Sequence, residues 1–97
     1  MKATLIHYSK VVSINGAIQE IVIWELPIKT TDQPHGIKYR LHFGFADGTC
    51  LLRYDNAKHK GDHKHLRNRE EPYAFTTVSQ LLKDFLADVD KVKEGMG

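Results

Sequence analysis

The sequence predicts an α+β fold, in which a four-stranded antiparallel sheet made of two hairpins carries a C-terminal helix on one face. Three observations predict it: an Asn-Gly and an Asp-Gly pair between β-rich segments, alternation of apolar and polar residues over 37–45, and an apolar stripe at helical spacing after residue 77. With 97 residues the chain can form one modest core, so we expect a single domain over 1–97.

The first hairpin is predicted at Asn15-Gly16, between "LIHYSKVVSI" and "AIQEIVIWEL". An Asn-Gly pair between segments rich in β-branched and aromatic residues is the strongest short-range hairpin signal. Trp24 is expected to be a core residue, as aromatic residues at strand spacing usually are.

The second hairpin is predicted with Asp47-Gly48 as a two-residue turn. This register pairs Phe45 with Cys50, Phe43 with Leu52 and Leu41 with Tyr54 on one face; on the other face His42 lies opposite Arg53, and Arg40 opposite Asp55. All three apolar pairs then share one face, as a correct register requires. The strands are expected over about residues 2–57.

A helix is predicted over about residues 77–93. Thr77 and Gln80 fit a capping box at its start. The apolar stripe consists of Val78, Leu81, Leu82, Phe85, Val89 and Val92. Such a stripe has to pack on another apolar surface, and the apolar face of the sheet provides one.

Residues 55–73 are predicted to form a basic loop. Between Arg53 and Arg69 lie six Lys or Arg, three histidines (His59, His63 and His65) and only two acids. The loop continues the polar sheet face, so a polyanion such as RNA is the expected ligand. Its expected contacts are Lys38, Arg40, Arg53, Lys58, Lys64, Arg67 and Arg69. The alternative is an ordinary solvated face on which Arg40 pairs with Asp55.

These residue types suit a metal-independent ribonuclease. Histidine can move protons near neutral pH because its unperturbed pKa is about 6.5, and lysine or arginine stabilises the charge that develops on phosphate. The histidines and aspartates are also metal-ligand types, but Lys58, Lys60 and Lys64 stand between them and no second cluster closes a tetrahedron. We therefore expect neither a metal nor a cofactor.

The location is expected to be the cytoplasm. The lone Cys50 excludes a disulfide within the chain, which indicates a reducing compartment. No apolar segment reaches the roughly 18–20 residues that span a bilayer, so no membrane association is expected.

The run "YDNAKHKGDHKH", followed by "REEPYAF", together with "GIKYRLHFGF" and the closing "LLKDFLADV", resembles the TumE family over about Lys2 to Val89. The resemblance implies a toxin of a toxin–antitoxin module, neutralised by direct contact with an antitoxin that often carries a helix-turn-helix DNA-binding domain. The family signature falls on Tyr54, Asp55, Asn56, Lys60, Gly61, Asp62, His63, His65, Arg69, Glu70, Pro72 and Tyr73.

Together these lines predict a toxin that cleaves RNA. His63 and His65 are expected to act as acid and base, with Lys60, Arg40 and Arg53 on the phosphate. Asp62 or Asp55 would orient a histidine, Tyr73 would lie near the substrate, and Gly61 would allow close approach of the backbone. Tyr54, Asn56 and Glu70 are expected in supporting roles.

Two alternatives from other classes stay open. One is a non-catalytic module whose basic loop binds RNA, DNA or an acidic protein. The other is a nucleotide- or metal-dependent enzyme that modifies a target. A homodimer formed through the edge strand near Met1 is a further expectation about assembly.

Overall fold

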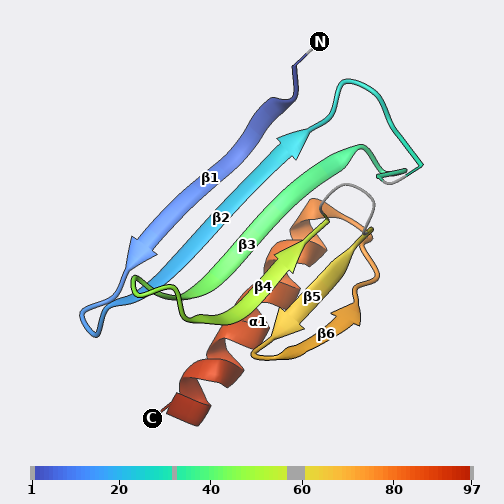
Figure 1. Ribbon diagram of the computed structural model, residues 1–97. Helices are drawn as coiled ribbons and strands as arrows, with labels where there is room; N and C mark the ends of the chain where they lie inside the picture. Colours follow the sequence, from blue (N-terminus) through green and yellow to red (C-terminus); the bar gives the residue numbers. More distant parts are fainter. Residues whose placement is uncertain (1, 32, 57–60, 97) are drawn as a thin grey trace.

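The computed structural model describes residues 2–31, 33–56 and 61–96. It contains one antiparallel sheet in which six strands follow each other in chain order, and one helix (Figure 1). The elements are β1 (Thr4–Val12), β2 (Ala17–Glu25), β3 (Ile37–Phe45), β4 (Cys50–Asp55), β5 (His63–Leu66), β6 (Arg69–Pro72) and α1 (Val78–Met96). The predicted α+β class with a C-terminal helix on the sheet is confirmed, but the predicted number of four strands is wrong.

The core lies between α1 and one face of the sheet. Its buried residues are Ala17, Ile21, Ile23, Tyr39, Leu41, Phe43, Leu52 and Tyr54 from the strands, with Leu81, Phe85, Val89 and Val92 from the helix. The Gln80 amide donates to Thr77 Oγ1 at 3.0 Å, so Thr77 caps the helix, while the Gln80 side chain donates to Asp84 at 2.7 Å and does not complete the predicted capping box. In Figure 1 the helix runs behind β3, β4 and β5, while β1 forms the far edge. We call the covered side the helix face and the other side the open face.

The register of the second hairpin is confirmed where Leu41 pairs with Tyr54 and Phe43 with Leu52, and wrong at the turn, where Gly44 rather than Phe45 pairs with Cys50. The turn has three residues instead of two, because the Phe45 amide donates to the Thr49 carbonyl at 2.9 Å. Gly48, with φ of 96°, occupies the left-handed position that such a turn requires. A bulge in β4 absorbs the extra residue, and Leu51 packs on the core there.

The prediction of a loop over 55–73 is also wrong, because β5 and β6 form a third hairpin that extends the sheet beyond β4. Its strands "HKHL" and "REEP" contain little apolar sequence, so no alternating pattern announced them. Arg67 begins the turn with φ of 57°, and its amide donates to the Leu51 carbonyl at 3.0 Å. The bulge in β4 therefore helps to anchor the third hairpin.

Asn56 joins the end of β4 to the start of β3. It is fully buried; its Nδ2 donates to the Ile37 carbonyl at 2.7 Å, and its Oδ1 accepts from the Tyr39 amide at 3.0 Å. Gln33 Nε2 donates to the backbone carbonyl of Asn56 at 2.8 Å. These bonds hold the place where the chain leaves the sheet. Among the described residues, no helix has the length and apolar character needed to cross a membrane.

Candidate functional site

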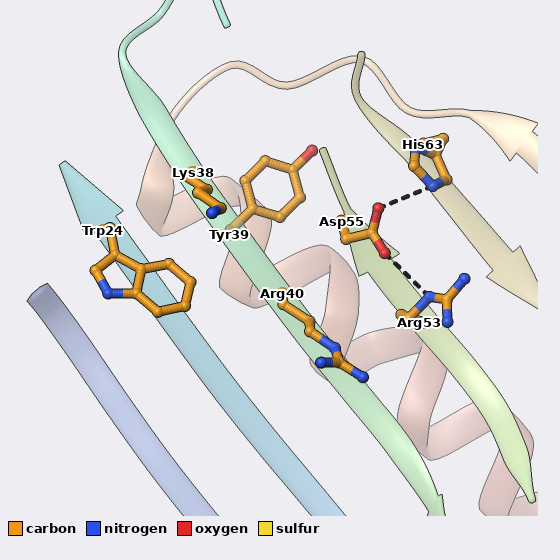
Figure 2. Close-up of a pocket in the computed structure, with 7 residues that line it drawn as sticks. All are labelled: Trp24, Lys38, Tyr39, Arg40, Arg53, Asp55 and His63. Carbon is orange, nitrogen blue, oxygen red and sulfur yellow. Dashed lines mark ion pairs between the residues drawn. The ribbon is translucent and has the colours of Figure 1, made fainter. Parts of the chain in front are cut away.

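A pocket of about 420 Å³ opens on the open face, across β2, β3, β4 and β5 (Figure 2). Its lining residues combine cations, an aromatic ring and an acid–histidine pair: Trp24, Lys38, Tyr39, Arg40, Arg53, Asp55 and His63. A concave site with convergent polar groups is the first candidate for a binding or catalytic site.

Strand alternation brings all of these side chains except Tyr39 to the open face; Tyr39 belongs to the core and only contributes to the pocket wall. Lys38 pairs with Trp24 across β2 and β3, and Asp55 lies between Arg40 on β3 and His63 on β5. The Lys38 ammonium lies 5.5 Å from the centre of the Trp24 ring, within the range of a cation–π contact. Each of the strands β2, β3, β4 and β5 therefore contributes at least one polar or aromatic side chain to the pocket.

The expectation that Trp24 belongs to the core is wrong. It is only partly buried and lines the pocket, while its neighbour Ile23 is fully buried on the helix face. The alternation of Ile21 and Ile23 already assigns Trp24 to the opposite face, and this signal could have identified it.

Asp55 connects two basic groups at one side of the pocket. Its Oδ1 lies 2.9 Å from His63 Nε2, and its Oδ2 lies 3.0 Å from Arg53 Nε. His63 Nδ1 faces the Gly61 carbonyl at 3.0 Å. Since both histidine nitrogens then face acceptors, a proton has to lie between Nε2 and Asp55 for that contact to be attractive.

His65 and Glu70 lie beside this pair. The rings of His63 and His65 are 5.2 Å apart. Glu70, half exposed on β6, has one carboxylate oxygen 3.8 Å from His63 Nε2 and the other 3.7 Å from His65 Nε2. His65 Nε2 is buried and has no hydrogen-bond partner among the described residues. The structure thus brings together the two histidines, Asp55 and Glu70.

Asp62, a predicted catalytic residue, faces a different histidine. Its carboxylate lies 3.1 Å from His35 Nε2 and accepts a hydrogen bond from Tyr39 Oη at 2.7 Å. Because His35 Nδ1 accepts from the Ile37 amide, Nε2 carries the proton and donates to Asp62. Burial and the bond to Asp62 raise the pKa of Tyr39. No sequence signal singled out His35.

Tyr54 and Tyr73 lie on the helix face, away from the pocket. The hydroxyl of Tyr54 donates to Asp88, and that of Tyr73 to Asp84 at 2.6 Å. Burial, followed by the bond to the carboxylate, raises the pKa of both tyrosines, and the bond from Tyr73 lowers the pKa of Asp84. Lys64 joins this group through Asp88 at 3.3 Å. The structure thus separates Tyr73 and Lys64 from the histidines.

The other predicted site residues are distributed as follows. Arg67 lies in the β5–β6 turn, and Arg69 follows it as an exposed residue of β6. Gly61 has φ of 71° and open space around its α-carbon, so its conformation rather than a close approach requires glycine. Lys58 and Lys60, with His59 between them, lie outside the described residues.

Fold and site together define a small α+β protein whose open sheet face carries cations and acid–base groups. The chain matches the family model described as Toxin TumE over residues 2–93. Because this match covers nearly all of the sequence, the chain belongs to the TumE toxin family, and it is the toxin of a toxin–antitoxin module with a cognate antitoxin as its partner. No curated protein and no solved structure matches it.

Proposed function

We propose that this toxin is a metal-independent endoribonuclease and that the open-face pocket is its active site. The observation that carries the proposal is the Asp55–His63 pair, 2.9 Å apart, in a pocket with three cationic side chains and Trp24. Phosphate recognition and proton transfer are the two requirements of RNA cleavage by its own 2′-hydroxyl, and both kinds of group meet here.

The cations of the pocket account for substrate binding. Lys38 and Arg40 are exposed and form no ion pair within the described ranges, so both can contact phosphate. Arg53 is oriented by Asp55 and lies across the strands from His65. Trp24 offers an aromatic surface for an unstacked base, as single-stranded RNA requires. Lys60 adjoins the site in sequence and is proposed as a further phosphate contact.

Two proton transfers complete the reaction. His65 Nε2, which lacks a hydrogen-bond partner in the described part of the chain, takes the proton of the 2′-hydroxyl once the half-exposed Glu70 moves aside. The 2′-oxygen attacks phosphorus, and the bond to the 5′-oxygen breaks. The proton held between His63 and Asp55 passes to that leaving oxygen. The products are a 2′,3′-cyclic phosphate and a 5′-hydroxyl end.

Other predicted catalytic residues act through the scaffold in this proposal. Asp62 orients His35 and Tyr39 at the pocket edge, and Tyr73 fixes α1 through Asp84. Gly61 presents its carbonyl to His63 Nδ1 and so sets the orientation of that ring.

A second candidate function is a non-catalytic module that binds RNA with the same face. The side chain of His63 is only 6% exposed, and both of its ring nitrogens face acceptors, as in a histidine with a structural role. In that case phosphate contacts alone would set the affinity, and binding would fall steeply with salt.

The deciding experiment compares a short single-stranded RNA with the same sequence carrying 2′-O-methyl groups, in the presence of a chelator. We expect the wild-type toxin to cleave only the unmodified RNA and to leave cyclic phosphate ends, since the 2′-hydroxyl is the nucleophile. The His63→Ala/His65→Ala double variant should bind RNA without cleaving it. His7→Ala, which changes a histidine on the distant strand β1, is the matched control. Binding of both RNAs without cleavage would favour the second candidate.

Three expectations about context accompany the proposal. An RNA substrate would place the toxin in the cytoplasm, and the cognate antitoxin is proposed to carry a helix-turn-helix domain. A homodimer would form through β1, the edge strand on which Leu5, Tyr8 and Val12 are exposed. Sedimentation of the purified toxin, alone and with its antitoxin, tests the assembly.

A further inference from the structure

We propose that a zinc ion binds on the open face through His63, His65 and Glu70, and that it switches the toxin off. The site itself stands on the geometry of these side chains alone. Its inhibitory effect rests on the proposed ribonuclease function, because the same histidine nitrogens are assigned there to proton transfer.

The three donor groups converge on one point. One ligand atom from each residue lies within 4.8 Å of the other two. The Glu70 carboxylate oxygens are 3.8 Å from His63 Nε2 and 3.7 Å from His65 Nε2. In a tetrahedral zinc site with metal–ligand bonds of roughly 2.0–2.1 Å, donor atoms are about 3.3 Å apart. Small side-chain rotations therefore suffice to bring the donors onto a shared ion.

The surroundings of the histidines support coordination through Nε2. His63 Nδ1 faces the Gly61 carbonyl at 3.0 Å and would donate to it with Nε2 bound to the metal, as the second nitrogen of a metal-ligating histidine typically does. His65 Nε2 is buried without a hydrogen-bond partner among the described residues, and a metal bond would satisfy it. Asp55 Oδ1 lies 2.9 Å from His63 Nε2, and His63 exchanges this contact for the metal when zinc binds.

The tertiary structure supplies the ligand that the sequence pattern lacks and turns Lys64 away from the site. The ligand missing from the sequence pattern is Glu70, which pairs with His65 only because 69–72 form a strand. Lys64, which stands between the two histidines in the sequence, points to the helix face and binds Asp88. Arg53, a described cation near the site, is paired with Asp55, whose Oδ2 lies 3.0 Å from Arg53 Nε.

A zinc ion held in this way blocks the proposed reaction directly. Coordination uses the lone pairs of both Nε2 atoms, so His65 cannot accept the 2′-hydroxyl proton, and His63 no longer shares one with Asp55. The toxin would then bind RNA through Lys38, Arg40 and Trp24 without cleaving it.

Isothermal titration of chelator-treated toxin with zinc chloride tests the site without any reference to activity. We expect one zinc ion per chain, and at least about 100-fold weaker binding for His65→Ala. Glu70→Gln, a change at a half-exposed position that preserves the fold, should weaken binding similarly, and His7→Ala should bind like wild type. In NMR spectra, zinc should shift the ring signals of His63 and His65 and leave those of His7 in place.

Absence of zinc binding by the wild-type toxin, or binding by His65→Ala and Glu70→Gln as tight as that of the wild type, would overturn the site. If zinc binds at these residues but RNA cleavage continues unchanged, the inhibitory role is overturned. If the metal-free toxin does not cleave RNA, the proposed function fails, while the titration still decides whether zinc binds here.

Discussion

The two faces of β4 and β5 carry similar ionisable groups in different surroundings. On the helix face, Tyr54 and Lys64 both reach Asp88 of the helix, and Tyr73 reaches Asp84, so each side chain has a fixed structural partner. On the open face, Asp55 and His63 line a pocket together with the exposed Lys38 and Arg40, and His65 lies beside His63. Consecutive residues of one signature therefore divide between scaffold and site, because successive strand residues point to opposite faces.

The largest expected difference between the faces is in catalysis. His65→Ala on the open face should lower the rate of RNA cleavage roughly 10²- to 10⁴-fold, the range for loss of a general base. Its midpoint of thermal unfolding should stay close to that of wild type, because His65 Nε2 forms no hydrogen bond with another described residue. Single-turnover cleavage and calorimetry give the two values. A large loss of stability without a specific loss of rate would contradict the assignment of the open face.

The next largest effect is expected in the scaffold. Asn56→Ala removes bonds to the Ile37 carbonyl and the Tyr39 amide, which stay buried without those partners. We expect the free energy of unfolding to fall by about 2–4 kcal/mol. Urea denaturation measures it, with Asn68→Ala in the exposed β5–β6 turn as the matched control. An equal effect of both changes would show that Asn56 does not hold β3 to β4.

A smaller effect is expected for substrate binding. Trp24→Ala should weaken the binding of single-stranded RNA by roughly 1–3 kcal/mol, the usual contribution of a base stacked on an aromatic ring. Leu5→Ala changes the neighbour of Trp24 on β1, outside the pocket, and should bind RNA like wild type. Fluorescence anisotropy with a labelled RNA compares the two. Unchanged binding by Trp24→Ala would remove this residue from the RNA-binding surface.

The smallest effect at neutral pH is expected for Tyr73→Phe. Loss of the hydrogen bond to Asp84 should lower the free energy of unfolding by about 1 kcal/mol. The raised pKa values of Tyr39, Tyr54 and Tyr73 also predict alkaline instability. These tyrosines stay protonated in the folded chain above about pH 10, where those of the unfolded chain ionise, so stability falls as pH rises beyond that value. Denaturation between pH 8 and pH 11 should show a shallower decline for Tyr73→Phe. An identical decline would contradict the role of Tyr73.

The fold was predictable wherever the signal is local. Asn15-Gly16 and Asp47-Gly48 mark two hairpins, and the spacing of Leu81, Phe85 and Val89 marks the helix. The third hairpin was not predictable, because residues 63–66 and 69–72 have neither an apolar alternation nor a glycine turn. Their pairing depends on the exposed edge of β4 and on polar contacts such as Lys64 with Glu71 at 3.5 Å.

The candidate site was predictable in part for the same reason. The pairing of Arg40 with Asp55 and of His42 with Arg53 followed from the register, and it placed cations on one face. The sequence could not reveal that Asp62 pairs with His35, 27 positions away, since that contact depends on the path of two connecting segments. Nor could it show that Glu70 lies beside the histidines, because β6 was not foreseen.

The sequence by itself determined which segments alternate between apolar and polar residues, where two of the turns lie and which side of the helix is apolar. It also determined that this chain resembles the TumE toxins. These properties depend on residues close together in the chain. Only the tertiary structure decided that His63, His65 and Glu70 share one face while Lys64 and Tyr73 serve the other. The physical reason is that successive residues of a strand point to opposite faces, and the register of the pairing decides which residues face which side. The pairing of β5 with β4 is a long-range contact, so the sequence pattern does not announce it.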